Sequence, residues 1–292
     1  MPDSDGGPIP EVARPLGDHS PMRPLPMPAA VPLTEGVIQL PDVDLWYSDT
    51  GGSGEPILLV HPFTGSGHIW GYQQPVLARA GYRVITYSRR GYRGSGTGPL
   101  ETPGKSAEDL RALADRLGLD RFHILGSAAG AFIAVAFAIT WPERLRTLTV
   151  ACSMVLPRED EFAQLLATVR VDGFSEMPAS FRELGPSYRS LNPRGVEQWE
   201  ALHAQSRESR PPVNQPVGAA ITSDALNALH LPTLVLSGDA DLFSPPPVAR
   251  AFCRLVNGSE LAVMTECGHS GYWERPDQFN AALLDFLTRH RG

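Results

Sequence analysis

Residues 126–130 read Gly-Ser-Ala-Ala-Gly and lie between an apolar run at 122–125 and an apolar helical stretch at 131–138. An apolar strand, a tight turn and an apolar helix in this order form the context of a G-x-S-x-G turn, whose central side chain is pushed out over a sheet from a strained backbone. Ala128 occupies the central position. Because its side chain carries neither oxygen nor sulfur, Ala128 cannot act as a nucleophile.

A second register of this turn places Ser127 at the centre. It puts Leu125 and Ala129 at the two positions where strand and helix approach closely and small residues are needed. The first register puts Gly126 and Gly130 there, and we favour it on this steric ground. Taken alone, the segment also fits a small-residue turn that merely connects a buried strand to a buried helix. Whether the turn has a catalytic or only a structural role must therefore be judged from the rest of the chain.

Composition narrows the class of protein. The chain has 292 residues, 42% hydrophobic and 20% charged, which suits one large α/β domain with an insertion. A net charge of −7 and a pI near 5.6 give no electrostatic reason to expect nucleic acid as a partner. No run of 18 apolar residues occurs, so we expect no membrane span. Three widely spaced cysteines favour reduced thiols and a cytoplasmic location: Cys152, Cys253 and Cys267.

Residues 1–34 form a segment of different composition, with nine prolines and little aliphatic periodicity. No basic start followed by an apolar core is present, so a secretory signal is not expected. We expect a proline-rich N-terminal arm, flexible or extended, packed on the surface. An oligomer is neither indicated nor excluded by the sequence.

Strand-like and helix-like segments alternate along most of the remaining chain. The expected strands are residues 36–40, 44–48, 56–60, 82–87, 122–125, 145–151, 233–237 and 260–264, and the expected helices include 106–117, 131–140, 246–255 and 276–289. Continuous apolar runs such as 56–60 indicate strands buried on both faces of a parallel sheet. The pattern predicts an α/β fold with a mostly parallel twisted sheet flanked by helices.

Residues 156–228 interrupt this alternation with helical segments at 159–170, 178–184 and 195–207 and no strong strand. A block of helices inserted between two parallel strands is expected to form a lid over the carboxyl edge of the sheet, where ligands bind in open α/β sheets. We therefore predict a core at residues 35–155 and 229–292 and a helical lid at 156–228.

Several segments together carry a family resemblance. They are Leu-Leu-Val-His-Pro-Phe-Thr-Gly-Ser at 58–66, Arg-Gly-Tyr-Arg-Gly-Ser at 90–95, the turn at 126–130, Gly-Asp-Ala-Asp at 238–241, and Gly-His at 268–269. From about residue 36 to its end, the chain resembles the α/β-hydrolase fold family. The family's order of nucleophile, acid and histidine then implies Ala128 at the nucleophile position, Asp241 as acid and His269 as base.

The resemblance also implies roles for these residues. Asp241 would accept the Nδ1 proton of His269 and hold the ring in one tautomer, while Asp239, the rival acid, is expected to form a turn. His269 would take the proton of the nucleophile and pass it to the leaving group. The oxyanion hole would use the backbone N–H groups of Phe63 and Ala129. Pro62 stands where the family often has glycine.

The lid and the loop after residue 87 contain aromatic side chains that we expect near a substrate, because ligand cavities are mainly apolar. The predicted pocket residues are Tyr92, Phe162, Phe181, Tyr188 and Trp199. The expected partner is a small-molecule substrate with a carbonyl group. The sequence contains no metal-ligand cluster and no dinucleotide fingerprint, so no metal and no cofactor is implied.

Two functions follow as hypotheses. In the first, the chain is a serine hydrolase of esters, thioesters, lactones or C–C bonds, acting through an acyl-enzyme, with alanine in place of serine at Ala128. In the second, it is a natural non-hydrolytic homologue, which binds a ligand or uses the Asp241–His269 pair as a base without a cofactor. An intact acid and base without a nucleophile favours the first.

Overall fold

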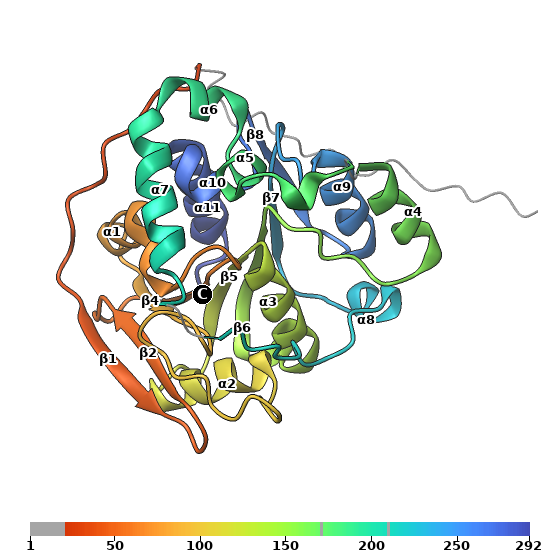
Figure 1. Ribbon diagram of the computed structural model, residues 1–292. Helices are drawn as coiled ribbons and strands as arrows, with labels where there is room; N and C mark the ends of the chain where they lie inside the picture. The colour runs from red at the N-terminus through yellow and green to blue at the C-terminus, as the bar shows by residue number, and fades with distance from the viewer. Residues whose placement is uncertain (1–20, 170–171, 209–210) are drawn as a thin grey trace, which may run out of the picture.

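Eight strands form one sheet in the computed structural model, which describes residues 21–169, 172–208 and 211–292 (Figure 1). The strand order is β1-β2-β4-β3-β5-β6-β7-β8. The hairpin β1–β2 and the pair β2–β4 are antiparallel, and all other neighbours are parallel. The bounds are β1 Thr34–Gln39, β2 Asp44–Asp49, β3 Pro56–Val60, β4 Arg83–Tyr87, β5 Phe122–Ser127, β6 Leu145–Ala151, β7 Thr233–Gly238 and β8 Glu260–Met264.

The central strands follow from their sequences. Every residue of β5 and β7 is buried, as is all of β3 after Pro56, because helices cover both faces of the parallel part of the sheet. The predicted limits of β3, β6 and β8 match the structure, and β5 extends two residues further, through Gly126 and Ser127. The predicted mostly parallel α/β sheet is therefore confirmed.

Helices pack on both faces of the sheet and enclose two hydrophobic clusters. One cluster lies against α2 (Ser106–Arg116), α3 (Ala129–Thr140) and α9 (Pro246–Leu255). The other lies against α1 (Gln74–Arg79) and α11 (Pro276–Arg289). Helix α3 is almost entirely apolar, with eight buried residues, which suits a helix enclosed on all sides.

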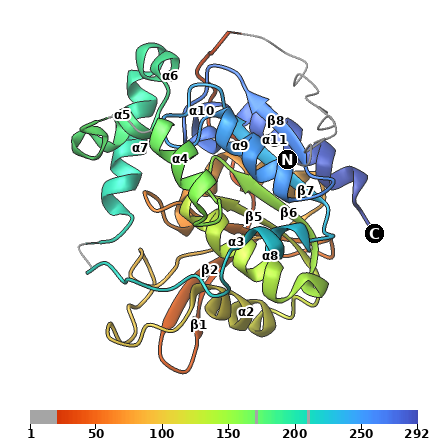
Figure 2. The same cartoon turned by 90° about the vertical axis from the view of Figure 1, so that its right-hand side faces the viewer.

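The segment between β6 and β7 contributes short helices, and α5, α6 and α7 lie together at the upper end of the molecule in two perpendicular views (Figure 2). The helices are α4 Asp160–Val169, α5 Ala179–Glu183, α6 Pro186–Leu191, α7 Pro193–Gln205 and α8 Ser223–Asn227. His269 N donates a hydrogen bond to Glu183 O at 2.7 Å, and His203 Nδ1 lies 2.9 Å from Thr64 O. Helices α5 and α7 thus touch the loops that follow β8 and β3.

The predicted N-terminal arm is described only from residue 21, and its first 20 residues lie outside the described part of the chain. Residues 21–33 form no helix or strand. They pack on the surface, where Tyr72 Oη donates a hydrogen bond to Leu25 O at 2.8 Å and the side chain of Met22 is buried.

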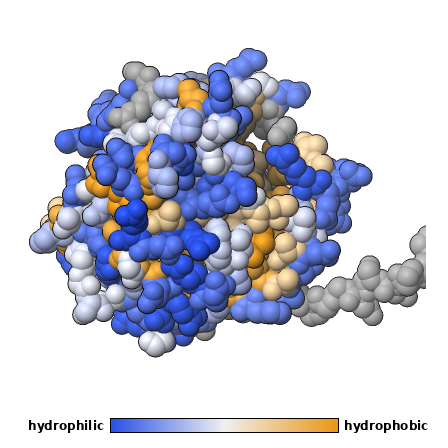
Figure 3. Space-filling model, turned by 90° about the horizontal axis from the view of Figure 1, so that it is seen from below, coloured by the Kyte–Doolittle hydropathy of each residue, from blue (hydrophilic) through white to orange (hydrophobic). Residues whose placement is uncertain are grey.

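The amino ends of the parallel strands lie on the side of the sheet away from α5 and α7, which contact the loops at the carboxyl ends. There the backbone N–H of Gly292 donates to Glu55 Oε1 at 3.1 Å, just before β3 begins. Seen from below the view of Figure 1, the surface is mostly hydrophilic with apolar patches (Figure 3). None of the helices in the described ranges combines the length and the hydropathy needed to cross a membrane.

Candidate active site

The turn between β5 and α3 has the strained backbone expected of its central residue. Ala128 has φ 48° and ψ −113°, a conformation that L-residues rarely adopt. Its backbone N–H donates to Ala151 O at 2.9 Å, and the Ser153 hydroxyl donates to Ala128 O at 2.8 Å. These two hydrogen bonds, from the end of β6 and the loop after it, hold the turn in place.

The two glycines of the turn lie where the backbone has no room for a side chain. A Cβ on Gly130 would lie 2.7 Å from the carbonyl carbon of Val60 and closer still to its oxygen, and a Cβ on Gly126 would lie 2.5 Å from Cα of Ala131. Ser127 is the last residue of β5, and its buried hydroxyl has no hydrogen-bond partner among the described residues. The turn therefore has Ala128, not Ser127, at its centre.

His269 and Asp241 meet at the carboxyl ends of β8 and β7. The Nδ1 atom of His269 lies 2.8 Å from Asp241 Oδ2 and 3.0 Å from Oδ1. Asp241 also accepts hydrogen bonds from Phe243 N at 2.8 Å, Ser244 N at 2.9 Å and the Ser244 hydroxyl at 2.7 Å. Asp239 instead accepts a bond from Cys267 N at 3.1 Å, away from the imidazole.

Electrostatics favour the charged forms of this buried pair. Burial is the largest single influence on the pKa of His269 and lowers it, but Asp241, with Glu183 and Glu274 nearby, outweighs burial and raises the pKa to about 9. Burial likewise opposes ionisation of Asp241, yet His269 and Ser244 hold the pKa of Asp241 below its usual value. Each member of the pair thus stabilises the charged form of the other, as expected for an imidazole that gains a proton during a reaction.

One cavity of about 540 Å³ is lined by four of the ten predicted site residues. Ala128, Ala129, Phe63 and His269 all line it. The backbone N–H groups of Phe63 and Ala129 have no acceptor within the described ranges, so both can donate to a ligand. Asp241 lies behind the imidazole and does not line the cavity.

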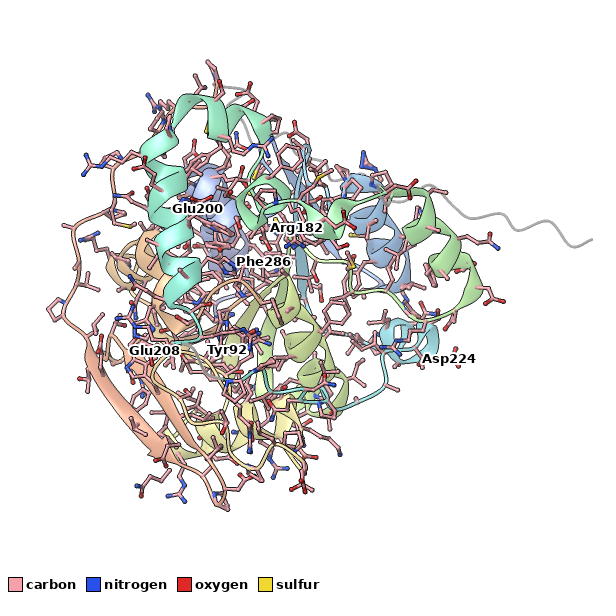
Figure 4. The ribbon with its side chains drawn as sticks, viewed as in Figure 1. Tyr92, Arg182, Glu200, Glu208, Asp224 and Phe286 are labelled. Atoms are coloured by element: carbon pink, nitrogen blue, oxygen red, sulfur yellow. The ribbon has the colours of Figure 1, made fainter. Side chains whose placement is uncertain are left out.

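The five predicted pocket side chains lie outside this lining. Phe162 packs in the cluster that contains α2 and α3, and Tyr188 and Trp199 pack in the cluster on the other face of the sheet. Phe181 is 40% exposed. Tyr92, near the lower end of α7 in Figure 4, donates from its hydroxyl to Phe63 O at 3.2 Å. Three of the five rings, those of Phe162, Tyr188 and Trp199, thus pack inside the hydrophobic clusters of the fold.

Several lining residues were not predicted from the sequence. They are Thr64, Arg89, Ser106, Phe132, Ile133, Ser153, Met154, Ala179, Arg182, Glu183, His203, Gln215, Val217 and Phe243. Glu183 is the most distinctive, because it is fully buried beside His269 and burial raises its pKa. No motif marks Glu183, whose position depends on how α5 meets the histidine loop.

A second cavity of about 560 Å³ adjoins the first and shares Met154, Arg182 and Phe243 with it. The Phe243 ring lies between them, with its centroid 4.5 Å from that of His269 and 4.7 Å from that of Phe174. Across the described ranges, no three His, Cys, Asp or Glu side chains gather in an arrangement that could hold a metal ion.

Comparison with known proteins identifies the family. The profile of the Alpha/beta hydrolase family matches residues 57–282. The chain belongs to the α/β-hydrolase family. The sheet order, the turn at Ala128 and the acid–histidine pair of this α/β-hydrolase agree with that assignment.

Relatives of similar length include proteins named as hydrolases. A Pseudomonas putida 2-hydroxy-6-oxononadienedioate/2-hydroxy-6-oxononatrienedioate hydrolase is 27% identical over 85% of this chain and 93% of its own length. A thermophilic esterase from Thermogutta terrifontis superposes with a TM-score of 0.71 at 28% identity, over 88% of this chain and 100% of the esterase. An enol-lactonase from Burkholderia xenovorans, with a TM-score of 0.71 at 20% identity over 87% and 100% of the two chains, shows the shared fold.

Proposed function

We propose that this α/β-hydrolase has the machinery of a serine hydrolase, with residue 128 at the position of the nucleophile and alanine removing the attacking atom. One observation carries the proposal. The left-handed turn at Ala128 and the imidazole of His269, backed by Asp241, line a single cavity together with two unpaired backbone N–H groups.

The mechanism follows from these positions when residue 128 carries a hydroxyl. Its oxygen attacks the substrate carbonyl while neutral His269 accepts the proton, and the N–H groups of Phe63 and Ala129 stabilise the oxyanion. His269 then protonates the leaving group, and a water molecule activated by the same ring releases the acyl group. Asp241 stabilises the imidazolium. The chain with Ala128 binds the carbonyl substrate but leaves it intact.

The substrate class rests on the lining and on the relatives. Phe132, Ile133, Met154, Val217 and Phe243 give the cavity an apolar wall, and polar and charged side chains line the rest of it, as expected for a small organic molecule that carries polar groups. Relatives of this chain are named as hydrolases of oxo-dienedioates and as an esterase. We therefore propose an ester, thioester, lactone or C–C bond next to a ketone as the bond for which the site is built.

A second candidate needs no atom on residue 128. The buried Asp241–His269 pair faces the cavity by itself, and such a pair supports proton transfer to and from a bound ligand without a covalent intermediate. On this reading, the cavity is a ligand-binding or base-catalysed site. It predicts that a hydroxyl at position 128 adds no hydrolysis.

The substitution Ala128→Ser tests the proposal. We expect hydrolysis of p-nitrophenyl esters, lactones or C–C substrates to rise by about 10⁴ to 10⁶-fold over the chain as given, in line with the cost of removing a nucleophile from a triad. The double variant Ala128→Ser with His269→Gln is the matched control and should lose most of that gain. A panel on which Ala128→Ser gains nothing contradicts the proposal and favours the second candidate.

A further inference from the structure

Two guanidinium groups gather around Tyr92 at the Phe63 end of the cavity. The Arg89 guanidinium carbon lies 4.7 Å from the centre of the Tyr92 ring, and that of Arg207 lies 4.3 Å from it. Both side chains donate to the Tyr92 hydroxyl, at 3.2 Å and 2.8 Å. Arg207 also lies over the Phe63 ring at 4.4 Å. Figure 4 shows Tyr92 near the lower end of α7, with Arg182, a residue of α5, further up.

Neither of these arginines has a carboxylate partner in the described ranges. Arg89 otherwise donates to His61 Nε2 and to Pro62 O, which are neutral acceptors. Arg207 Nη1 is buried and has no hydrogen-bond partner there. Glu208, next along the chain, pairs with Arg93 at 3.5 Å. Stacking on an aromatic ring stabilises a cation but does not neutralise it.

Two other arginines of the fold form salt bridges with carboxylates. Arg83 pairs with Asp49 at 2.6 Å, and Arg90 pairs with Asp109 at 2.7 Å and with Asp42 at 2.9 Å. At these two positions the packing provides carboxylates that neutralise the arginine. Arg89 and Arg207 instead keep two like charges close together, and both contribute to holding the pKa of buried His61 well below its usual value, after burial itself.

This pair of charges reaches the cavity through Arg89, and Arg207, which is not part of the lining, stacks on Phe63 and Tyr92 beside it. Arg89 lines it, as does Phe63, which is 57% exposed and so lies at its mouth. The backbone N–H of Phe63 belongs to the proposed oxyanion hole. A ligand whose carbonyl occupies that hole has room to extend past Phe63 toward the guanidinium group of Arg89.

We propose that Arg89 and Arg207 form an anion subsite beside Phe63, which takes the carboxylate or phosphate group of the small molecule whose carbonyl lies over Ala128. The placement of the carbonyl rests on the proposed function, whereas the anion subsite itself does not. Guanidinium groups bind both anions through charge-assisted, often bidentate hydrogen bonds. Tyr92 fixes the two groups in place as a positioning residue.

Binding to the chain as given tests the subsite without turnover. The probes are the monomethyl esters of straight-chain dicarboxylic acids from succinic to suberic, their neutral dimethyl esters, and the methyl esters of matching ω-phosphooxy acids. We expect calorimetry to show that at least one monoanion binds about 10 to 100-fold more tightly than its neutral partner. The carboxylate and phosphate series distinguish the two anions.

The deciding quantity is the dissociation constant of the neutral dimethyl ester divided by that of the matching monoanion. General damage to the cavity weakens both ligands alike and leaves this ratio unchanged, whereas loss of the anion subsite lowers it. Arg89→Met and Arg207→Met should each reduce the preference for the anion by about tenfold, and Arg207→Lys should retain part of it. Arg93→Met, outside the cavity, is the matched control and should keep the full ratio.

Two outcomes overturn the subsite. One is equal affinity for anionic and neutral ligands in the chain as given. The other is a preference that survives both methionine substitutions and disappears in Arg182→Met, which would put the anion at the Phe243 end. If Ala128→Ser fails to hydrolyse neutral esters while the anion preference remains, the proposed function fails and the subsite stands.

Discussion

At the scale of single residues, His269 is the group whose titration follows most directly from its surroundings. Its folded pKa of about 9 lies above its ordinary value of 6.5 because Asp241 and two further carboxylates outweigh burial. The contribution of His269 to stability is therefore fully present below pH 6.5 and is lost as the pH rises through about 9, whereas that of Asp241, with its lowered pKa, is lost in acid.

Asp241→Asn tests this electrostatic coupling. Removing the carboxylate charge leaves the burial of His269 in place, so the NMR titration midpoint of the ring should fall from about 9 toward or below 6.5. Between pH 6.5 and 9, the free energy of unfolding of the unsubstituted chain should decline more steeply with pH than that of Asp241→Asn. The difference in slope is up to about 1.4 kcal/mol per pH unit for one group. A midpoint near 6.5 before substitution contradicts the expectation.

Residue identities in the site were only partly predictable from the sequence. Ala128, Asp241 and His269 stand in short motifs at the ends of strands, where the parallel sheet brings its carboxyl ends together. Glu183 and Arg89 carry no such signal. Their places in the cavity depend on tertiary contacts, the first through the bond from His269 N and the second through Pro62 O.

At the scale of elements, the contact between α3 and β3 constrains the site. Gly130→Ala would drive a methyl group into the backbone of Val60, although alanine is the better helix former. We expect a loss of about 2–4 kcal/mol in the free energy of unfolding, measured in urea. Gly96→Ala is the control, since its Cβ would have ordinary contacts from 3.5 Å outward. Equal stability of the two variants contradicts the steric account.

Prediction of elements succeeded where the periodic signal was long. Strands β3, β6 and β8 and helices α9 and α11 have the expected limits, because buried apolar runs and proline at a helix start are strong local signals. Helices α6 and α8, of six and five residues, were missed because such short segments hold less than two turns of pattern. The same shortness explains why Tyr188, on α6, was assigned to a pocket, although its ring packs in a hydrophobic cluster.

At the scale of the whole molecule, Glu274 joins the inserted helices to the histidine loop. Its carboxylate accepts bonds from Gly185 N at 2.6 Å, Gly268 N at 3.1 Å and Ser270 N at 3.2 Å. Burial raises the pKa of Glu274 to about 8 despite these donors. One buried side chain thus connects the segment before α6 with the loop that carries His269.

Glu274→Gln should loosen this connection. The amide nitrogen of glutamine cannot accept a bond, so at least one backbone N–H loses its partner, at a cost of about 1–3 kcal/mol. We expect faster hydrogen exchange at residues 185, 268 and 270 by mass spectrometry or NMR. Glu197→Gln, on an exposed part of α7, is the control. Unchanged exchange in Glu274→Gln would show that the inserted helices are anchored elsewhere.

The hydrogen bond between Gly292 and Glu55 has a practical consequence for measuring binding. It places residue 292 at the amino ends of the strands, whereas the cavity opens at their carboxyl ends. A tether attached there would hold the protein on a sensor chip or a bead with the cavity turned to the flowing solution. Immobilised in that orientation, the chain with Ala128 would, under the proposed function, act as an affinity matrix that retains its uncleaved ligand from a complex mixture.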